Sequence, residues 1–75
     1  MEDLERAMLA IYQATVPSKI PFVDADPLIA RLGLTKKVPI KQMLRERGFL
    51  GLCPISAICL SESGIRYVEE HLLRR

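Results

Sequence analysis

The chain contains few of the residues that build aromatic surfaces or metal centres. It has no tryptophan, two phenylalanines, two tyrosines, one histidine and two cysteines among its 75 residues. So few aromatic side chains argue against a stacking surface for single-stranded nucleic acid. A structural zinc ion needs about four ligands, and only His71 and acidic side chains far along the chain could join Cys53 and Cys59. We therefore expect no metal and no cofactor.

Long apolar runs and a leader segment are also absent. The longest uncharged stretch covers residues 48–60 and includes Pro54, whereas a membrane-spanning helix needs about 20 apolar residues. Residues 1–6 are acidic and lack the basic and apolar regions of a signal peptide. We expect a cytoplasmic location and no membrane partner.

No pattern of catalytic residues can be traced in the sequence. His71 has no nucleophile or carboxylate at a spacing that indicates catalysis. Asp24 and Asp26 precede Pro27, where they serve better as helix caps than as an acid–base pair. A glycine-rich phosphate loop is missing as well. We expect that the protein is not an enzyme.

Cys53 and Cys59 are separated by five residues across a predicted turn. A disulfide between them requires that the two residues lie opposite each other in suitable geometry. A cytoplasmic location favours reduced thiols, and a free cysteine behaves as a small apolar side chain. We expect free, largely buried thiols, with a redox switch as the alternative.

The charge of the chain is unevenly distributed. The formal net charge is +2. Residues 36–47 carry five cations against a single carboxylate, a local charge of +4, while residues 48–60 carry no charge at all. The basic excess therefore lies in one segment. Such asymmetry is information about a partner rather than about the fold.

Length and hydrophobic spacing predict a single domain over residues 1–75. Domains usually need about 100–200 residues, which leaves no room for a second one. The first helix has an apolar stripe made of Leu4, Met8, Ile11 and Thr15. This helix ends at Val16, because the residue before Pro17 is disfavoured in helical conformation.

Two short helices are predicted next. The first begins after Asp24 or Asp26, either of which can cap it, and Gly33 suits its left-handed end. The second has two alternative starts. Either Thr35 is the cap and Pro39 lies in the first turn, or Pro39 occupies the first helical position.

The second half of the chain combines β character with a last helix. Residues 49–60 predict a β-hairpin with a turn at 54–57, and Phe22–Val23 is long enough for a short edge strand. Ser61 is placed to cap the last helix. The apolar side of that helix consists of Ile65, Val68 and Leu72.

The order of helix, short strand, helix, turn, helix, hairpin and helix resembles the winged helix-turn-helix family of small bacterial and archaeal DNA-binding regulators. Residues 24–35 look like the first helix of the pair, and residues 45–50 look like the end of the recognition helix running into the wing. Residues 60–64 resemble the leucine-serine-x-x-glycine that follows the wing. The resemblance implies an α+β, mostly helical fold with a three-helix core, a C-terminal β-hairpin wing and a fourth helix.

The second helix of such a pair enters the major groove of double-stranded DNA. The resemblance implies that lysines in this segment contact phosphates, that Gln42 reads a base edge and that Arg45 does either. The DNA-binding residues that we predict are Thr35, Lys36, Lys37, Lys41, Gln42 and Arg45. This function would be that of a small transcriptional regulator or accessory protein. The alternative is a solvated helix face that only keeps the protein soluble.

The uncharged hairpin indicates a second hypothesis. Neighbouring residues of a strand alternate sides, so its apolar side chains cannot all face inward, and exposed apolar patches mark partner sites. The predicted protein interface, with a homodimer as one form, consists of Leu52, Ile55, Ile58 and Tyr67. The chain would then be a winged-helix protein–protein module without DNA binding. In the alternative, the first or last helix covers both faces of the hairpin.

Overall fold

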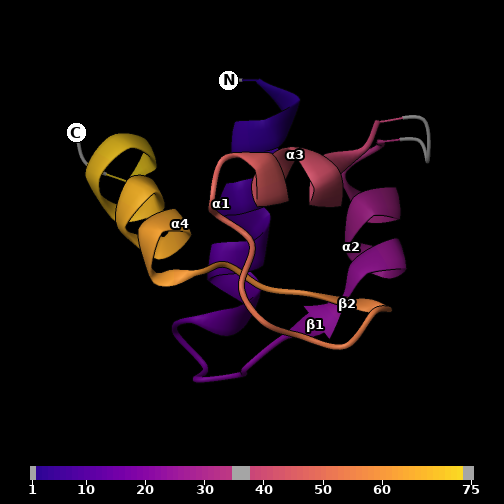
Figure 1. Ribbon diagram of the computed structural model, residues 1–75, viewed down its shortest axis with the longest axis horizontal. Helices are drawn as coiled ribbons and strands as arrows, with labels where there is room; N and C mark the ends of the chain where they lie inside the picture. Colours follow the sequence, from indigo (N-terminus) through magenta and orange to yellow (C-terminus); the bar gives the residue numbers. More distant parts are fainter. Residues whose placement is uncertain (1, 35–37, 74–75) are drawn as a thin grey trace.

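Four α-helices and a two-stranded antiparallel sheet form the described part of the chain, residues 2–34 and 38–73, in this computed structural model (Figure 1). The elements, in chain order, are α1 (Asp3–Thr15), β1 (Val23–Asp24), α2 (Ala25–Arg31), α3 (Ile40–Glu46), β2 (Ala57–Ile58), α4 (Glu62–Tyr67) and the π-helical turn η1 (Val68–Leu72). The predicted α+β class is confirmed. Within these residues, no helix has both the length and the apolar character that a membrane crossing demands.

The first helix forms as its hydrophobic spacing predicts. The buried side of α1 consists of Leu4, Ala7, Met8, Ile11 and Thr15. The Thr15 hydroxyl, although buried, is satisfied because it donates to the carbonyl oxygen of Ile11 at 2.7 Å. The helix ends at Thr15 with Val16 as its cap residue, close to the predicted end. The reason given for that end is wrong, because Val16 keeps helical angles (φ −66°, ψ −51°) although it precedes Pro17.

The helices α2 and α3 are short, and both are followed by a glycine in left-handed conformation. Gly33 and Gly48 have φ angles of +76° and +75°, which glycine adopts without steric cost. At the start of α2, Asp24 occupies the cap position. The N–H of Ala25 donates to the carbonyl oxygen of Ser56 at 3.0 Å. The Asp24 side chain makes no capping hydrogen bond, and a distant loop satisfies this first N–H of the helix.

The start of α3 follows the second of the two predicted alternatives more closely. The helix begins at Ile40, and Pro39 is the cap residue with φ −81° and ψ 67°, outside the helical region. The N–H of Ile40 donates to the carbonyl oxygen of Val38 at 2.8 Å. Thr35, the cap in the other alternative, lies outside the described residues.

The short sheet joins distant parts of the chain. Val23 lies opposite Ile58, and Asp24 lies opposite Ala57, in antiparallel register. The edge strand predicted at Phe22–Val23 is present but displaced by one residue towards Asp24.

The predicted hairpin is closed at its base and at its turn. Leu50 and Leu60 form an isolated antiparallel bridge, and the N–H of Ala57 donates to the carbonyl oxygen of Pro54 at 3.0 Å. The second arm of the hairpin contributes β2, which pairs with β1 rather than with the first arm. The segment predicted as a hairpin, residues 49–60, is therefore a loop closed by one bridge between Leu50 and Leu60. Its regular strand pairing is between β2 and β1.

A single core joins the N-terminal helix to the last one. In Figure 1, α1 runs through the middle of the fold, with α2 and α3 on one side and α4 on the other. α1 contacts α2, α3 and η1. The largest fully buried side chains come from α1, α3, β2 and η1 and are Met8, Ile11, Ile40, Leu44, Ile58 and Val68. This core holds α3 with its polar face outward.

Candidate nucleic-acid interface

Lys41 and Arg45 lie about one turn apart on α3, so their side chains share a face of the helix. Both line a hollow of about 470 Å³ between α3 and the hairpin loop, which we define as residues 51–56. The other residues that line it are Leu50, Gly51, Leu52, Cys53 and Ile55. Arg45 is exposed and Lys41 is half-buried. The hollow thus combines two cations of α3 with the apolar side chains of the hairpin loop.

A hydrogen bond connects α3 directly to the hairpin loop. The Nζ of Lys41 donates to the carbonyl oxygen of Ile55 at 2.6 Å. A lysine ammonium has three N–H donors, so two remain for an anionic partner after this bond is made. The contact therefore holds the Lys41 ammonium at the hairpin loop. Because the acceptor is a neutral carbonyl, the positive charge can still attract an anionic partner.

Gln42 is exposed on α3 beside these cations. Its Nε2 donates to the carboxylate of Glu46 at 3.2 Å, one turn further along the helix. Exposed pairs at this spacing contribute only about 0.2–0.5 kcal/mol, so the Gln42 amide can exchange this partner for a base edge at little cost. On the side of α2, Gln42 and Asp26 both line a second hollow of about 540 Å³.

Half of the predicted DNA-binding residues are brought together by α3. Lys41, Gln42 and Arg45 all project from this helix. The predicted residues outside the described part of the chain are Thr35, Lys36 and Lys37. Among residues 2–34 and 38–73, the one ion pair joins Arg6 to Asp3 at 3.4 Å. The charge of Arg45 is therefore not neutralised by a described carboxylate.

The residues predicted to form a protein interface are separated by the fold. Leu52 and Ile55 are 101% and 96% exposed, whereas Ile58 is 0% exposed. The prediction that Ile58 contributes to a surface is wrong, because β2 does not alternate. Ala57, its neighbour in the strand, is buried as well, so both faces of β2 are covered and Ile58 belongs to the core.

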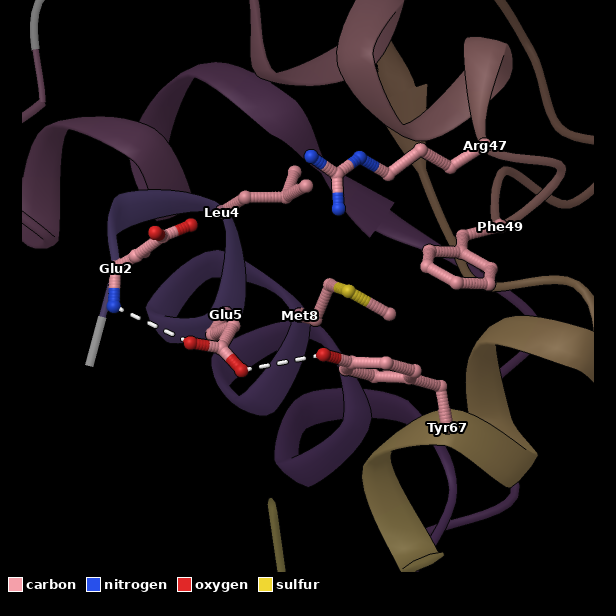
Figure 2. A pocket seen from close by; sticks show the side chains of 7 residues that line it. All are labelled: Glu2, Leu4, Glu5, Met8, Arg47, Phe49 and Tyr67. Carbon is pink, nitrogen blue, oxygen red and sulfur yellow. Dashed lines mark hydrogen bonds between the residues drawn. The ribbon is translucent and has the colours of Figure 1, made fainter. Parts of the chain in front are cut away.

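The fourth of these residues, Tyr67, makes contacts within the molecule. Its ring centroid lies 5.1 Å from that of Phe49 and 4.8 Å from that of His71. Its hydroxyl donates to the Glu5 carboxylate at 3.2 Å. Figure 2 shows this bond beside a pocket of about 240 Å³, with Arg47 extending over it from the end of α3. Burial, and then the bond to Glu5, raises the pKa of Tyr67. Tyr67 therefore joins α4 to α1.

Both cysteines are free thiols at the hairpin loop, Cys59 buried and Cys53 half-buried. The Sγ of Cys53 donates to the carbonyl oxygen of Ala57 at 3.4 Å, and that of Cys59 donates to the carbonyl oxygen of Leu52 at 3.5 Å. Burial raises the pKa of the Cys59 thiol to about 11, and the neighbouring Cys53 thiol adds to the shift. The predicted free thiols are present, with Cys53 more open than expected.

We expect Cys59 to react slowly with thiol reagents. The thiolate is the reactive form, so a pKa of about 11 makes the reaction near pH 8 about a hundredfold slower than that of an ordinary cysteine. The measurement is the rate of modification of Cys59 in the wild-type protein, folded and in denaturant, with Cys59 distinguished from Cys53 by peptide mass spectrometry. Equal rates in the two states would contradict the prediction.

The same shift predicts how stability depends on pH. The folded-state pKa of Cys59 lies above the ordinary value of 9.0, so folding favours the protonated thiol. Its contribution to stability is complete below about pH 9 and is lost as the pH rises through about 11.

Of the described cations, Lys41 and Arg45 line the hollow beside the hairpin loop, and Arg47 lines the pocket beside Tyr67. Within the described part of the chain, no three or more histidine, cysteine, aspartate or glutamate side chains are grouped so that they could hold a metal ion. Comparisons of the chain with protein-family models, with curated proteins and with solved structures found no match.

Proposed function

We propose that the chain is a winged helix-turn-helix protein that binds double-stranded DNA through α3, as a small transcriptional regulator or accessory protein. The observation that carries the proposal is the exposed face of α3, where Lys41 and Arg45 line one hollow beside the hairpin loop. The element order supports the fold assignment. So does the strand arrangement, in which the hairpin's second arm meets both β1 and Leu50.

In this proposal α3 lies in the major groove and its cations neutralise phosphates. Arg45 and the free N–H donors of Lys41 reach the backbone, since charge-assisted hydrogen bonds from such groups to phosphate oxygens are strong. Gln42 exchanges its bond with Glu46 for the bidentate contact that an amide makes with adenine. Lys36 and Lys37 add to the positive segment in the sequence, and the proposal assigns them phosphate contacts.

The carboxylate of Asp26 restricts the direction from which DNA approaches. Asp26 lines the hollow on the α2 side of Gln42, and its carboxylate repels phosphates. Lys41 lines this hollow as well as the one at the hairpin loop, whereas Arg45 lines only the hollow at the loop. The DNA backbone is therefore expected to follow the loop side of α3.

The salt dependence of DNA binding tests this function. With about four phosphates neutralised, the slope of log K against log salt is about −3 to −4 between about 50 and 200 mM salt. The double variant Lys41→Gln/Arg45→Gln should reduce the slope by about 2 and weaken binding at low salt by about tenfold or more. Fluorescence anisotropy with a random-sequence duplex measures both quantities.

Arg66→Gln is the matched control for this experiment. Arg66 is an exposed cation on α4, so its replacement lowers the net charge without touching α3. We expect it to leave the slope within the error of the wild-type value. If the wild-type protein shows no salt-dependent binding at low salt, the proposed function is wrong.

The exposure of Leu52 and Ile55 favours a second candidate function, a winged-helix protein–protein module that does not bind DNA. A homodimer formed through these side chains would be detected by sedimentation velocity. In that case Ile55→Asp would halve the sedimenting mass, and the wild-type protein would show no affinity for DNA. The two candidates are therefore separated by two measurements on the same samples.

A further inference from the structure

The hairpin loop presents two aliphatic side chains entirely to water. Leu52 is 101% exposed and Ile55 is 96% exposed. They lie in the uncharged stretch 48–60, so no lysine or arginine of this stretch competes for the same surface. Water contact of this apolar area is unfavourable. A partner that buries both side chains is therefore favoured, provided that it also accepts the neighbouring charges.

The hairpin loop is held in place at several points. The Nζ of Lys41 donates to the carbonyl oxygen of Ile55 at 2.6 Å, and the turn is closed by the bond from Ala57 to Pro54 at 3.0 Å. The Sγ of Cys59 donates to the carbonyl oxygen of Leu52. Both exposed side chains thus come from residues whose own carbonyl groups are anchored. The loop presents them with little conformational entropy left to lose on binding.

The charges around the hairpin loop differ on its two sides. On the side of α3 the loop shares its hollow with Lys41 and Arg45. On the side of α2, Asp24 pairs with Ala57 at the end of the turn, and Asp26 follows in the first turn of the helix. A partner that binds the α3 side needs negative charge to meet Lys41 and Arg45. Directly beside that charge it needs an apolar cleft that can bury Leu52 and Ile55. The phosphates and the stacked bases of a DNA duplex have this arrangement.

We propose that Leu52 and Ile55 insert as an apolar wedge into the minor groove of the DNA, next to the major groove that α3 occupies. This inference rests on the proposed function. Minor-groove proteins insert leucine or isoleucine between base steps, which partly unstacks them and kinks the duplex. Lys41 joins the wedge to α3 through its bond to Ile55, so the wedge lies beside the phosphates that α3 contacts.

The test compares the wild-type protein with Leu52→Ser/Ile55→Ser. Both side chains are exposed, so the double variant should fold normally. The probes are two random-sequence duplexes, one fully paired and one with a central mismatch, labelled at both ends for energy transfer. A mismatch has already lost part of the stacking that insertion must break. We expect the wild-type protein to prefer the mismatched duplex about tenfold and to bend both.

The double variant should lose the preference and the bending, yet keep the salt slope of the wild-type protein. Ile20→Ser, which replaces an exposed isoleucine outside the hairpin loop, should behave like the wild type. Salt-dependent binding without bending or mismatch preference would overturn the wedge and leave the proposed function standing. If bending survives in the double variant while its sedimenting mass falls, the surface belongs to a second copy of the chain and the wedge is wrong. Absence of DNA binding would remove both proposals.

Discussion

Replacing Ile58 with alanine should lower the free energy of unfolding by about 2–5 kcal/mol. Ile58 has no exposed surface and lies in β2 opposite Val23, in a core that includes α1 and η1. Truncation removes buried methyl groups and leaves a cavity that these elements cannot fill. A chain of this size has a total stability of about 4–11 kcal/mol, so this single change removes a large part of it.

Ile55→Ala is the matched control, because the same residue type three positions earlier is 96% exposed. We expect this change to alter the free energy of unfolding by less than about 0.5 kcal/mol. Urea denaturation followed by circular dichroism measures both variants. In thermal denaturation each lost kcal/mol corresponds to about 4–8 °C in Tm. Similar losses for the two isoleucines would mean that β2 is not buried as described.

Gly64→Ala should destabilise the protein although alanine favours a helix. Gly64 is buried in α4, and a Cβ added there would lie 2.7 Å from the carbonyl oxygen of Phe49 and 3.2 Å from the Cβ of Leu60. The same Phe49 oxygen accepts the N–H of Ser61 at 2.8 Å, so it cannot move without weakening the start of α4. Overpacking of this kind costs about 1–3 kcal/mol. Because the added Cβ meets both the Phe49 oxygen and the Leu60 Cβ, we expect the cost to exceed the helix-propensity gain of about 1 kcal/mol.

The neighbouring Ser63 provides the control for this prediction. Ser63 is exposed on α4, so Ser63→Ala changes the helix propensity without introducing a steric contact. We expect a Tm at or slightly above that of the wild type for Ser63→Ala and a Tm several degrees lower for Gly64→Ala. A Gly64→Ala variant more stable than Ser63→Ala would show that α4 does not approach Phe49 as closely as described.

Local signals in the sequence predicted the helices well. The spacing of Leu4, Met8 and Ile11 placed the buried side of α1, because periodicity is set within one helix. Ser61 was predicted as the cap of α4, and its hydroxyl indeed accepts the N–H of Gly64 at 3.2 Å. Gly33 was predicted as a left-handed terminus and has φ +76°. Each of these features depends on residues within about one turn of each other.

Pairings between residues far apart in the sequence were harder to predict. The sequence placed β1 and the hairpin as separate features, and nothing local indicated that β2 would pair with β1 rather than within the hairpin. The alternation of side chains along a strand predicted that some apolar residues of the hairpin, Ile58 among them, would be exposed. Both residues of β2 are buried instead. Ile58 was thus wrongly assigned to the surface, while Leu52 and Ile55, in the irregular loop before it, are fully exposed.

The candidate site was predicted in part. Lys41 and Arg45 were both predicted to bind DNA, and their spacing of four residues places them on one face of α3, where both line the same hollow. The bond between Lys41 and the Ile55 carbonyl had no signal in the sequence, because any backbone carbonyl can accept and the choice depends on tertiary structure. The Glu5–Tyr67 bond spans 62 residues and was hidden for the same reason.

The contacts between the two ends of the chain affect how the protein can fold as it is synthesised. Tyr12 donates to Glu69 at 2.9 Å, Tyr67 donates to Glu5, and Val68 completes the core against α1. The apolar stripe of α1 therefore has no final cover until residues 67–69 have left the ribosome. Because α1 emerges well before these residues, it is open to aggregation or chaperone binding in between, so nascent chains halted before Val68 should remain non-native.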